Sequence, residues 1–210
     1  MVKLTLDTLV KYLGINYVPT GENKGYYVLP VAEKFGEVIV GRAVSKQYVS
    51  AFLKFFKSMQ RGGRLVLDFQ NVVILSPLVP KKILAKLQER EKSSSHSYRD
   101  RYILFKDPNE DIRCVLDYVA AGSNCSPLLY YSGRNSYEIL SLPEFLRETI
   151  ELIRKHGSLT SSELEGYLGR KKGRSAKERS RLLVVRRLVE RDLKWTPYGN
   201  RFFSYKMVTL

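Results

Sequence analysis

The sequence predicts a protein of two domains, a layered α/β domain over residues 1–140 and an α+β domain over residues 143–210. In the first part, short apolar runs typical of strands alternate with segments whose apolar residues recur at helical spacing. In the second part, three helical segments come first, and two strand-like segments around a turn-rich link come last. Pro143 marks the boundary, because proline is favoured in the first turn of a helix.

The first domain is expected to alternate strands with helices. Ser45 can cap its second helix, and Gly62 with Gly63 ends that helix. The run 65–75 is mostly apolar and contains β-branched residues, which predicts a central strand covered on both faces. The expected elements are a helix over 6–13, strands over 26–29 and 37–40, a helix over 45–59, strands over 65–69 and 72–75, a helix over 80–91, a strand over 102–105 and a helix over 110–120.

This order of strands and helices resembles a STAS-like domain, the fold of anti-sigma-factor antagonists, over residues 25–122. The most specific part is the run 66–76, which looks like that family's strand, acidic turn and second apolar run before a helix. Antagonists of the family carry a phosphorylatable serine at the start of that helix, within an Asp-Ser-Ser-Gly pattern that is missing here. The resemblance therefore implies an interaction or dimerisation module without a phosphorylation switch.

Capping signals and glycines divide the second domain into its elements. Thr160 and Glu163 have the spacing of a capping box, and Ser175 and Glu178 repeat it. The expected elements are a helix over 143–156 closed by Gly157, a short strand at Leu159, a helix to Leu168 closed by Gly169, a helix from 175 to about Asp192, and a hairpin with strands at 193–195 and 201–206. The buried stripe of the third helix is expected to be Leu182, Val185, Leu188 and Val189.

Three helices followed by a hairpin, with a helix-turn-helix entry over 158–169, resemble a winged helix-turn-helix domain over residues 143–210. The resemblance implies that the third helix enters the major groove of duplex DNA. It also implies that the hairpin, or wing, rests on phosphates or enters the minor groove. Because winged helices also mediate protein contacts, the charge of these segments has to decide between the two roles.

The charge of the chain favours a polyanionic partner. Thirty-six Lys and Arg against 21 Asp and Glu leave a formal net charge of +15, which attracts polyanions over a Debye length. Residues 170–187 hold nine basic residues and one acid, a net of +8 around the start of the third helix, where the helix dipole adds partial positive charge. We therefore expect nucleic acid as the partner, with duplex DNA first and RNA second.

The third helix and the hairpin are expected to supply the contacts. Lys177 and Arg181, together with Arg174, project away from the predicted apolar stripe. Trp195, Phe202 and Phe203 are assigned to the core rather than to stacking on bases. The expected nucleic-acid contacts are Arg170, Lys171, Lys172, Arg174, Lys177, Arg179, Arg181, Lys194, Asn200 and Arg201.

No set of catalytic, metal-binding or cofactor-binding residues is recognised in the sequence. After Asp68, no predicted strand carries the Glu-x-Lys of a metal-dependent nuclease, so Asp68 is interpreted as a turn or cap residue. Cys114 and Cys125 form no Cys-x-x-Cys and no Cys/His cluster, and they are expected to be free thiols. Because the sequence contains no run of eighteen apolar residues, a cytoplasmic protein without a membrane partner is expected.

The preferred interpretation is a transcriptional regulator that contacts duplex DNA through its second domain and forms a homodimer through its first. The alternative is a translation or DNA-processing factor whose basic face binds RNA or a DNA junction. A third interpretation is a metal-dependent nuclease with an acidic site around Asp68. Sequence-specific duplex binding would favour the regulator, and a preference for RNA or branched DNA would favour the alternative. The nuclease requires metal-dependent cleavage that the Asp68→Ala substitution abolishes.

Overall fold

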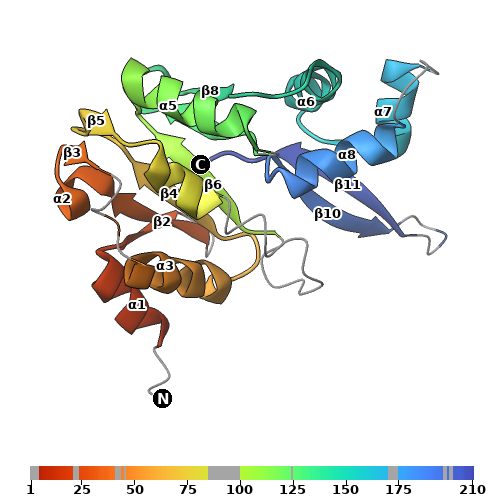
Figure 1. Cartoon of the computed structure of the whole chain (residues 1–210). Helices are drawn as coiled ribbons and strands as arrows, with labels where there is room; N and C mark the ends of the chain where they lie inside the picture. Colours follow the sequence, from red (N-terminus) through yellow and green to blue (C-terminus); the bar gives the residue numbers. More distant parts are fainter. Residues whose placement is uncertain are drawn as a thin grey trace. The chain divides into compact units, whose positions relative to one another are not determined.

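The computed structural model describes residues 5–20, 24–40, 44, 46–84, 100–123, 125–169, 175–195, 198 and 201–210. These residues form a mixed α/β structure, as the sequence predicts. The chain divides into two compact units, unit 1 (Met1–Ser141) and unit 2 (Leu142–Leu210) (Figure 1).

Unit 1 is built around a six-stranded mixed sheet. In spatial order its strands are β1 (Asn16–Thr20), β2 (Lys24–Pro30), β4 (Arg64–Asp68), β6 (Tyr102–Lys106), β7 (Leu128–Tyr131) and β8 (Ser136–Ile139). The four inner strands run parallel to one another, and the two edge strands are antiparallel to their neighbours. Leu65, Val66 and Leu67 of β4 are all buried, so the expected central strand covered on both faces is confirmed.

The helices expected at 6–13, 45–59 and 110–120 occur in unit 1, and a short helix at 31–35 was not predicted. Residues 78–84 are also helical, as expected for the start of the helix at 80–91. The rest of that helix and the predicted cap Ser45 lie outside the described residues. The confirmed helices are α1 (Leu6–Leu13), α3 (Lys46–Ser58) and α5 (Glu110–Ala121), and a short helix, α2 (Val31–Phe35), follows β2.

One hydrophobic core joins these helices to the sheet. Phe52, Phe55 and Phe56 of α3 are fully buried in it. The same core contains alternate residues of the central strands, such as Leu65 and Phe105, because successive side chains of a strand point to opposite faces. The aromatic face predicted for the helix at 45–59 is therefore the face that packs on the sheet.

The strands expected at 37–40 and 72–75 exist but are shorter and do not join the large sheet. They are β3 (Val38–Ile39) and β5 (Ile74–Leu75), which pair in parallel as a separate two-stranded sheet. Ile39 and Leu75 point into the core, whereas Val38 and Ile74 point to solvent. The run 65–75 is thus one central strand followed by a short strand of another sheet.

Three strands of the large sheet were not predicted. β1 has a polar sequence with Pro19 in it, which an edge strand tolerates because one side of its backbone has no pairing partner. β7 and β8 form an antiparallel pair around the short 3-10 helix η2 (Ser132–Arg134), and Asn135 closes the turn with a φ of 44°. β1 and β8 lack the apolar runs that mark buried strands, whereas β7 is an apolar run, Leu128–Tyr131, that the sequence-based prediction missed.

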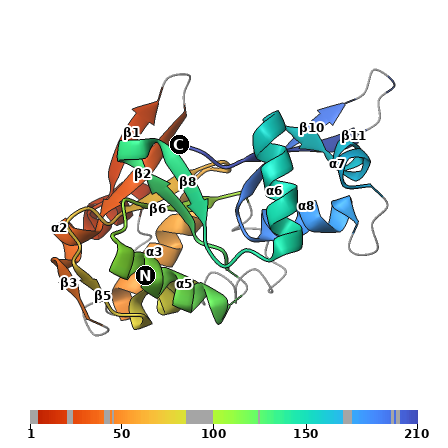
Figure 2. The same ribbon diagram turned by 90° about the horizontal axis from the view of Figure 1, so that it is seen from above.

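Unit 2 contains each helix and strand that the sequence predicts, with one boundary changed. In chain order its elements are α6 (Glu144–His156), β9 (Leu159–Thr160), α7 (Ser161–Leu168), α8 (Ala176–Val185), β10 (Val189–Trp195) and β11 (Arg201–Met207) (Figure 2). The strands form an antiparallel three-stranded sheet in the order β10-β11-β9. α6 and α7 pack against β11, and α8 packs against β10.

The changed boundary is the end of α8, which stops at Val185 and not near Asp192. Arg187 has a φ of 59°, and this left-handed residue reverses the chain so that residues 189–195 become a strand. The predicted buried stripe is only partly right: Leu188 and Val189 are buried but follow the helix, Leu182 is half-buried and Val185 is exposed. Leu183 of α8 is fully buried instead. The residues of α8 that are buried are Ala176, Arg179, Ser180 and Leu183.

Candidate nucleic-acid interface

The capping box predicted at the start of α7 is confirmed. The Thr160 hydroxyl accepts a hydrogen bond from the backbone N–H of Glu163 at 3.2 Å, and Oε2 of Glu163 accepts one from the backbone N–H of Thr160 at 2.7 Å. This backbone hydrogen bond lowers the pKa of Glu163 below its ordinary value. Gly169 ends the helix with a φ of 66°, a conformation that suits glycine.

The start of α8 is held by two acceptors from the protein itself. The Ser175 hydroxyl accepts from the backbone N–H of Glu178 at 3.3 Å, which is the N-cap half of the capping box predicted there. Oε2 of Glu165, on α7, accepts from the backbone N–H of Ala176 at 2.9 Å. A carboxylate therefore already lies at this helix N-terminus and links α7 to α8. Phosphate binding by these N–H groups is not needed to stabilise the helix.

Lys177 and Arg181 occupy the exposed side of α8. They are four residues apart, which places both side chains on one side of the helix about one turn from each other. The buried residues of α8 lie on the other side, against α6 and α7. Of the other expected contacts, Arg170, Lys171, Lys172, Arg174 and Asn200 lie outside the described residues.

Arg179 does not belong to this exposed surface, and its prediction as a nucleic-acid contact is wrong. The residue is only 6% exposed. Its Nη1 atom donates a hydrogen bond to the backbone carbonyl of Phe145 at 2.9 Å and lies 3.1 Å from Oε2 of Glu148. Because both partners belong to α6, Arg179 fixes α8 to α6 instead of facing solvent.

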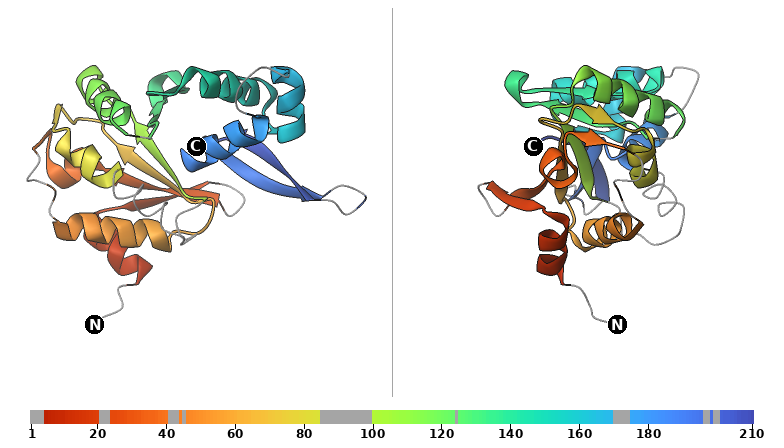
Figure 3. Two further views of the ribbon diagram at one scale, coloured as in Figure 1. Left: turned by 45° about the vertical axis from the view of Figure 1, so that its right-hand side comes forward. Right: turned by 60° about the vertical axis from the view of Figure 1, so that its left-hand side comes forward.

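The hairpin of β10 and β11 supplies two further exposed cations, Lys194 and Arg201. Lys194 pairs with Phe202 and Arg201 pairs with Trp195 across the hairpin, so the two cations lie on opposite faces of it. The end of the hairpin extends beyond the helices of unit 2 (Figures 2 and 3). Tyr198, in the turn, is also exposed.

The assignment of Trp195 and Phe203 to the core is wrong, because both side chains reach solvent. Trp195 is 57% exposed and Phe203 is 41% exposed, whereas Phe202 is half-buried. The guanidinium of Arg201 lies 4.6 Å from the centre of the Trp195 ring, and that of Arg191 lies 5.2 Å from the centre of the Phe203 ring. The hairpin therefore presents aromatic rings paired with cations, an arrangement that the sequence pattern did not indicate.

In unit 1, polar side chains gather at the carboxyl ends of the parallel strands β4 and β6. Nζ of Lys106 lies 2.6 Å from Oδ2 of Asp68 and 3.6 Å from Oδ2 of Asp107. Partial burial by itself lowers the pKa of Lys106, but the hydrogen bond and charge of Asp68, with the charge of Asp107, raise it above its ordinary value. The lysine is therefore a fixed cation between two carboxylates.

The same cluster confirms the interpretation of Asp68 as a turn residue. Its Oδ1 atom accepts a hydrogen bond from the backbone N–H of Gln70 at 3.1 Å, the pattern of an Asx turn. Asp107 is held in a similar way, because the backbone N–H and the hydroxyl of Ser132 donate to its two carboxylate oxygens at 2.7 and 2.6 Å. Hydrogen bonds within the protein thus occupy both carboxylates.

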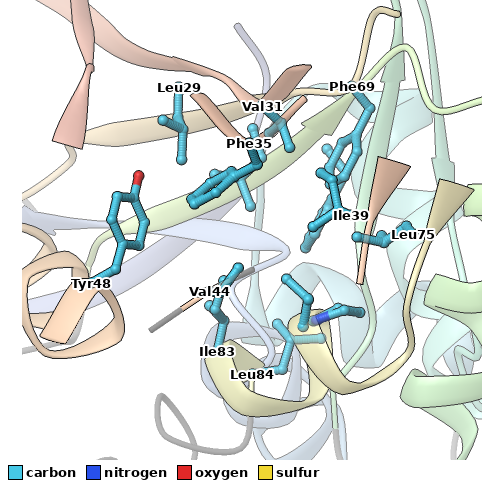
Figure 4. Close-up of a pocket in the computed structure, with 14 residues that line it drawn as sticks. Leu29, Val31, Phe35, Ile39, Val44, Tyr48, Phe69, Leu75, Ile83 and Leu84 are labelled. Carbon is cyan, nitrogen blue, oxygen red and sulfur yellow. The ribbon is translucent and has the colours of Figure 1, made fainter. Parts of the chain in front are cut away.

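An apolar cavity of about 40 Å³ lies in the core of unit 1 (Figure 4). Its walls come from the ends of β2, β4 and β6 and from the segments around the small β3–β5 sheet. The one polar atom on a lining side chain is the Tyr48 hydroxyl, which donates to the backbone carbonyl of Leu13 at 3.0 Å. Burial raises the pKa of Tyr48 well above its ordinary value. Among the described residues that line it, the cavity is therefore an apolar packing gap whose one side-chain hydroxyl is already hydrogen-bonded.

Within the described ranges, His, Cys, Asp and Glu side chains do not gather in threes where they could hold a metal ion. None of the helices in the same ranges combines the length and apolar character that crossing a bilayer requires. The cations of unit 2 therefore form the strongest candidate site. Comparisons of the chain with models of protein families, with characterised proteins and with solved structures found no match.

Proposed function

We propose that this protein binds duplex DNA through unit 2 and acts as a transcriptional regulator. The observation that carries the proposal is the pair of exposed cations Lys177 and Arg181, one turn apart on the side of α8 away from the helices that anchor it. Lysine and arginine so spaced suit contacts to phosphates or to guanine edges in a major groove.

The order of elements supports the same proposal. Unit 2 has a first helix, a short strand, two further helices and a hairpin, which is the order of the winged helix-turn-helix domains that its sequence resembles. In that arrangement α8 is the recognition helix and the β10–β11 hairpin is the wing, which contributes Lys194 and Arg201. Arg179 then has a supporting role, since it holds α8 in place without touching DNA.

Unit 1 is, in this proposal, the dimerisation domain that the STAS-like resemblance implies. A two-fold dimer would present two copies of α8 to a palindromic site. The small β3–β5 sheet and its surroundings expose an aliphatic surface suited to a protein contact. Its exposed residues are Val38, Val40, Val73, Ile74 and Leu78. Sedimentation equilibrium measures the dimer, and the Val38→Glu/Ile74→Glu variant is expected to sediment as a monomer.

A binding titration tests the proposal directly. Random-sequence duplex DNA, single-stranded DNA and structured RNA are compared at two salt concentrations. Wild-type protein is expected to bind the duplex most tightly, and the Lys177→Glu/Arg181→Glu variant is expected to lose that binding. The matched control is Lys54→Glu/Lys57→Glu, which reverses two exposed cations on α3 and changes the net charge equally. This control separates contact at α8 from a general effect of net charge.

The alternative function, an RNA- or junction-binding factor, predicts a different ranking of the same ligands. Structured RNA would then bind more tightly than the duplex at both salt concentrations. Equal loss of binding in the α8 variant and in the α3 control would mean that overall charge, and not the α8 surface, attracts the nucleic acid. Either result would reject the regulator proposal.

A further inference from the structure

The hairpin of unit 2 has one face that changes from buried to exposed along its length. Leu193 lies opposite Phe203, and Trp195 lies opposite Arg201. Because residues directly opposite one another share a face of an antiparallel pair, these four side chains lie together. Near the base of the hairpin, the side chains on the same face, Val189, Tyr205 and Met207, are buried. We call the outer part, formed by the exposed Leu193, Trp195, Arg201 and Phe203 with the half-buried Arg191, the outer hairpin face.

The outer hairpin face exposes more apolar side-chain surface than the solvent-facing side of a strand usually does. Leu193 is 47% exposed, and the rings of Trp195 and Phe203 are exposed to a similar extent. On the opposite face of the same strands, the exposed positions hold the polar residues Asp192, Lys194 and Lys206. Large exposed apolar side chains gathered on one face are typical of a contact surface.

Two arginines distinguish this face from an ordinary apolar protein contact. Arg201 lies over the Trp195 ring and Arg191 lies over the Phe203 ring, at the distances of cation–π pairs. A guanidinium is planar, so it stacks on flat rings and also pairs with phosphate. Single-stranded nucleic acid matches both properties, because each base offers a flat π face and is joined to a phosphate.

We infer that the outer hairpin face stacks on unpaired bases, so that the protein prefers DNA in which a duplex adjoins an unpaired segment. The inference rests on the proposed function, because α8 supplies the duplex contact; the unpaired segment is an opened stretch within that duplex and not a branched junction or a folded RNA. In a continuous duplex the bases are stacked on one another, and their faces are open only at ends, gaps and unpaired loops. Trp195 and Phe203 are the stacking residues, and Arg191 and Arg201 position the strand through its phosphates.

Trp195 makes the inference directly measurable, because it is the only tryptophan in the chain. The full-length protein is titrated with three probes: a duplex with a central unpaired thymine loop, a fully paired duplex of equal length, and heparin, which has charge but no bases. The looped duplex is expected to quench Trp195 fluorescence strongly, and the other two are expected to change it little. The protein is also expected to bind the looped duplex at least about fivefold more tightly than the paired duplex.

Substitutions separate stacking from charge. Trp195→Ala/Phe203→Ala is expected to bind the looped and paired duplexes equally while keeping the wild-type affinity for the paired one. Trp195→Phe keeps a ring and is expected to retain part of the preference. The control Tyr118→Ala removes an exposed aromatic ring from α5 and is expected to keep all of it. An unchanged thermal melting curve shows that each variant is folded.

The two proposals fail in different ways. If wild-type protein binds the paired duplex and loses this binding in Lys177→Glu/Arg181→Glu, but shows no preference for the looped duplex and no selective quenching, the stacking inference alone is wrong. The inference is also wrong if Trp195→Ala/Phe203→Ala retains the full preference. If wild-type protein binds none of the DNA probes, the proposed function and the inference are both wrong.

Discussion

Arg179 of α8 and Glu148 of α6 form an ion pair in which Nη1 lies 3.1 Å from Oε2. The arginine side chain is nearly inaccessible to solvent, and the same Nη1 atom also donates to the backbone carbonyl of Phe145. A buried guanidinium is tolerated here because groups of the protein accept its hydrogen bonds and balance its charge. Although it is one of nine basic residues between 170 and 187, Arg179 therefore acts as a structural tie between two helices.

Removing this tie is expected to destabilise the fold. Arg179→Ala leaves the Phe145 carbonyl and the Glu148 carboxylate without their cation and opens space between the helices. We expect it to lower the free energy of unfolding by about 2–4 kcal/mol. Arg181→Ala, two residues along on the exposed side, is expected to change it by less than about 0.5 kcal/mol. Urea denaturation measures both, and equal small effects would mean that Arg179 is solvated.

The capping box of α7 gives a pH-dependent contribution to stability. Glu163→Gln removes the charge near the helix N-terminus and is expected to lower the free energy of unfolding by about 0.3–1 kcal/mol at pH 7. Because folding lowers the pKa of Glu163 from its ordinary value of 4.5, this difference is fully present above that value. It is lost as the pH falls through the lowered pKa. Denaturation at several pH values checks this, and a difference that persists at pH 2 would contradict it.

Much of unit 2 could be predicted because its boundaries are set by local chemistry. Thr160 with Glu163 and Ser175 satisfy helix N-termini, and Gly157 and Gly169 supply the positive φ that ends a helix. The end of α8 has no such signal. It depends on Arg187 in a left-handed conformation, and an arginine does not mark that conformation in the sequence.

The errors at the candidate site have the same physical origin. A helix that continues to Asp192 would have its apolar side at Leu182 and Val185, and Arg179 would then lie away from that side. The true buried side follows from the position of α6, a tertiary contact that helical periodicity does not encode. Trp195 was assigned to the core because large aromatics are usually buried. Its exposure depends on how far the hairpin extends beyond the helices, which no local pattern reveals.

Lys106 is expected to stabilise the carboxyl end of the large sheet. Lys106→Met leaves the carboxylates of Asp68 and Asp107 without their cation and is expected to lower the free energy of unfolding by about 1–3 kcal/mol at pH 7. Because folding raises the pKa of Lys106 above its ordinary 10.5, the contribution is present below that value and is lost as the pH rises through the raised pKa.

A double-mutant cycle isolates this interaction from the loss of the lysine side chain. Asp68→Asn retains an oxygen that accepts from Gln70 while removing the charge. Lys106→Met is then expected to be less destabilising in the Asp68→Asn background than in wild type. Additive effects would show that the 2.6 Å contact contributes no coupling energy. Unchanged DNA binding by each variant would place this cluster outside the binding site, as the proposed function requires.

The salt dependence of binding counts the phosphates that α8 contacts. Each neutralised phosphate of duplex DNA contributes about 0.9 to the slope of the logarithm of the binding constant against the logarithm of the salt concentration. If Lys177 and Arg181 each contact one phosphate, Lys177→Ala/Arg181→Ala is expected to make the slope less steep by about 1.8. The control Lys54→Ala/Lys57→Ala should leave the slope unchanged. Weaker binding of the α8 variant at an unchanged slope would instead indicate that its cations contact base edges, because such contacts are less sensitive to salt than phosphate contacts.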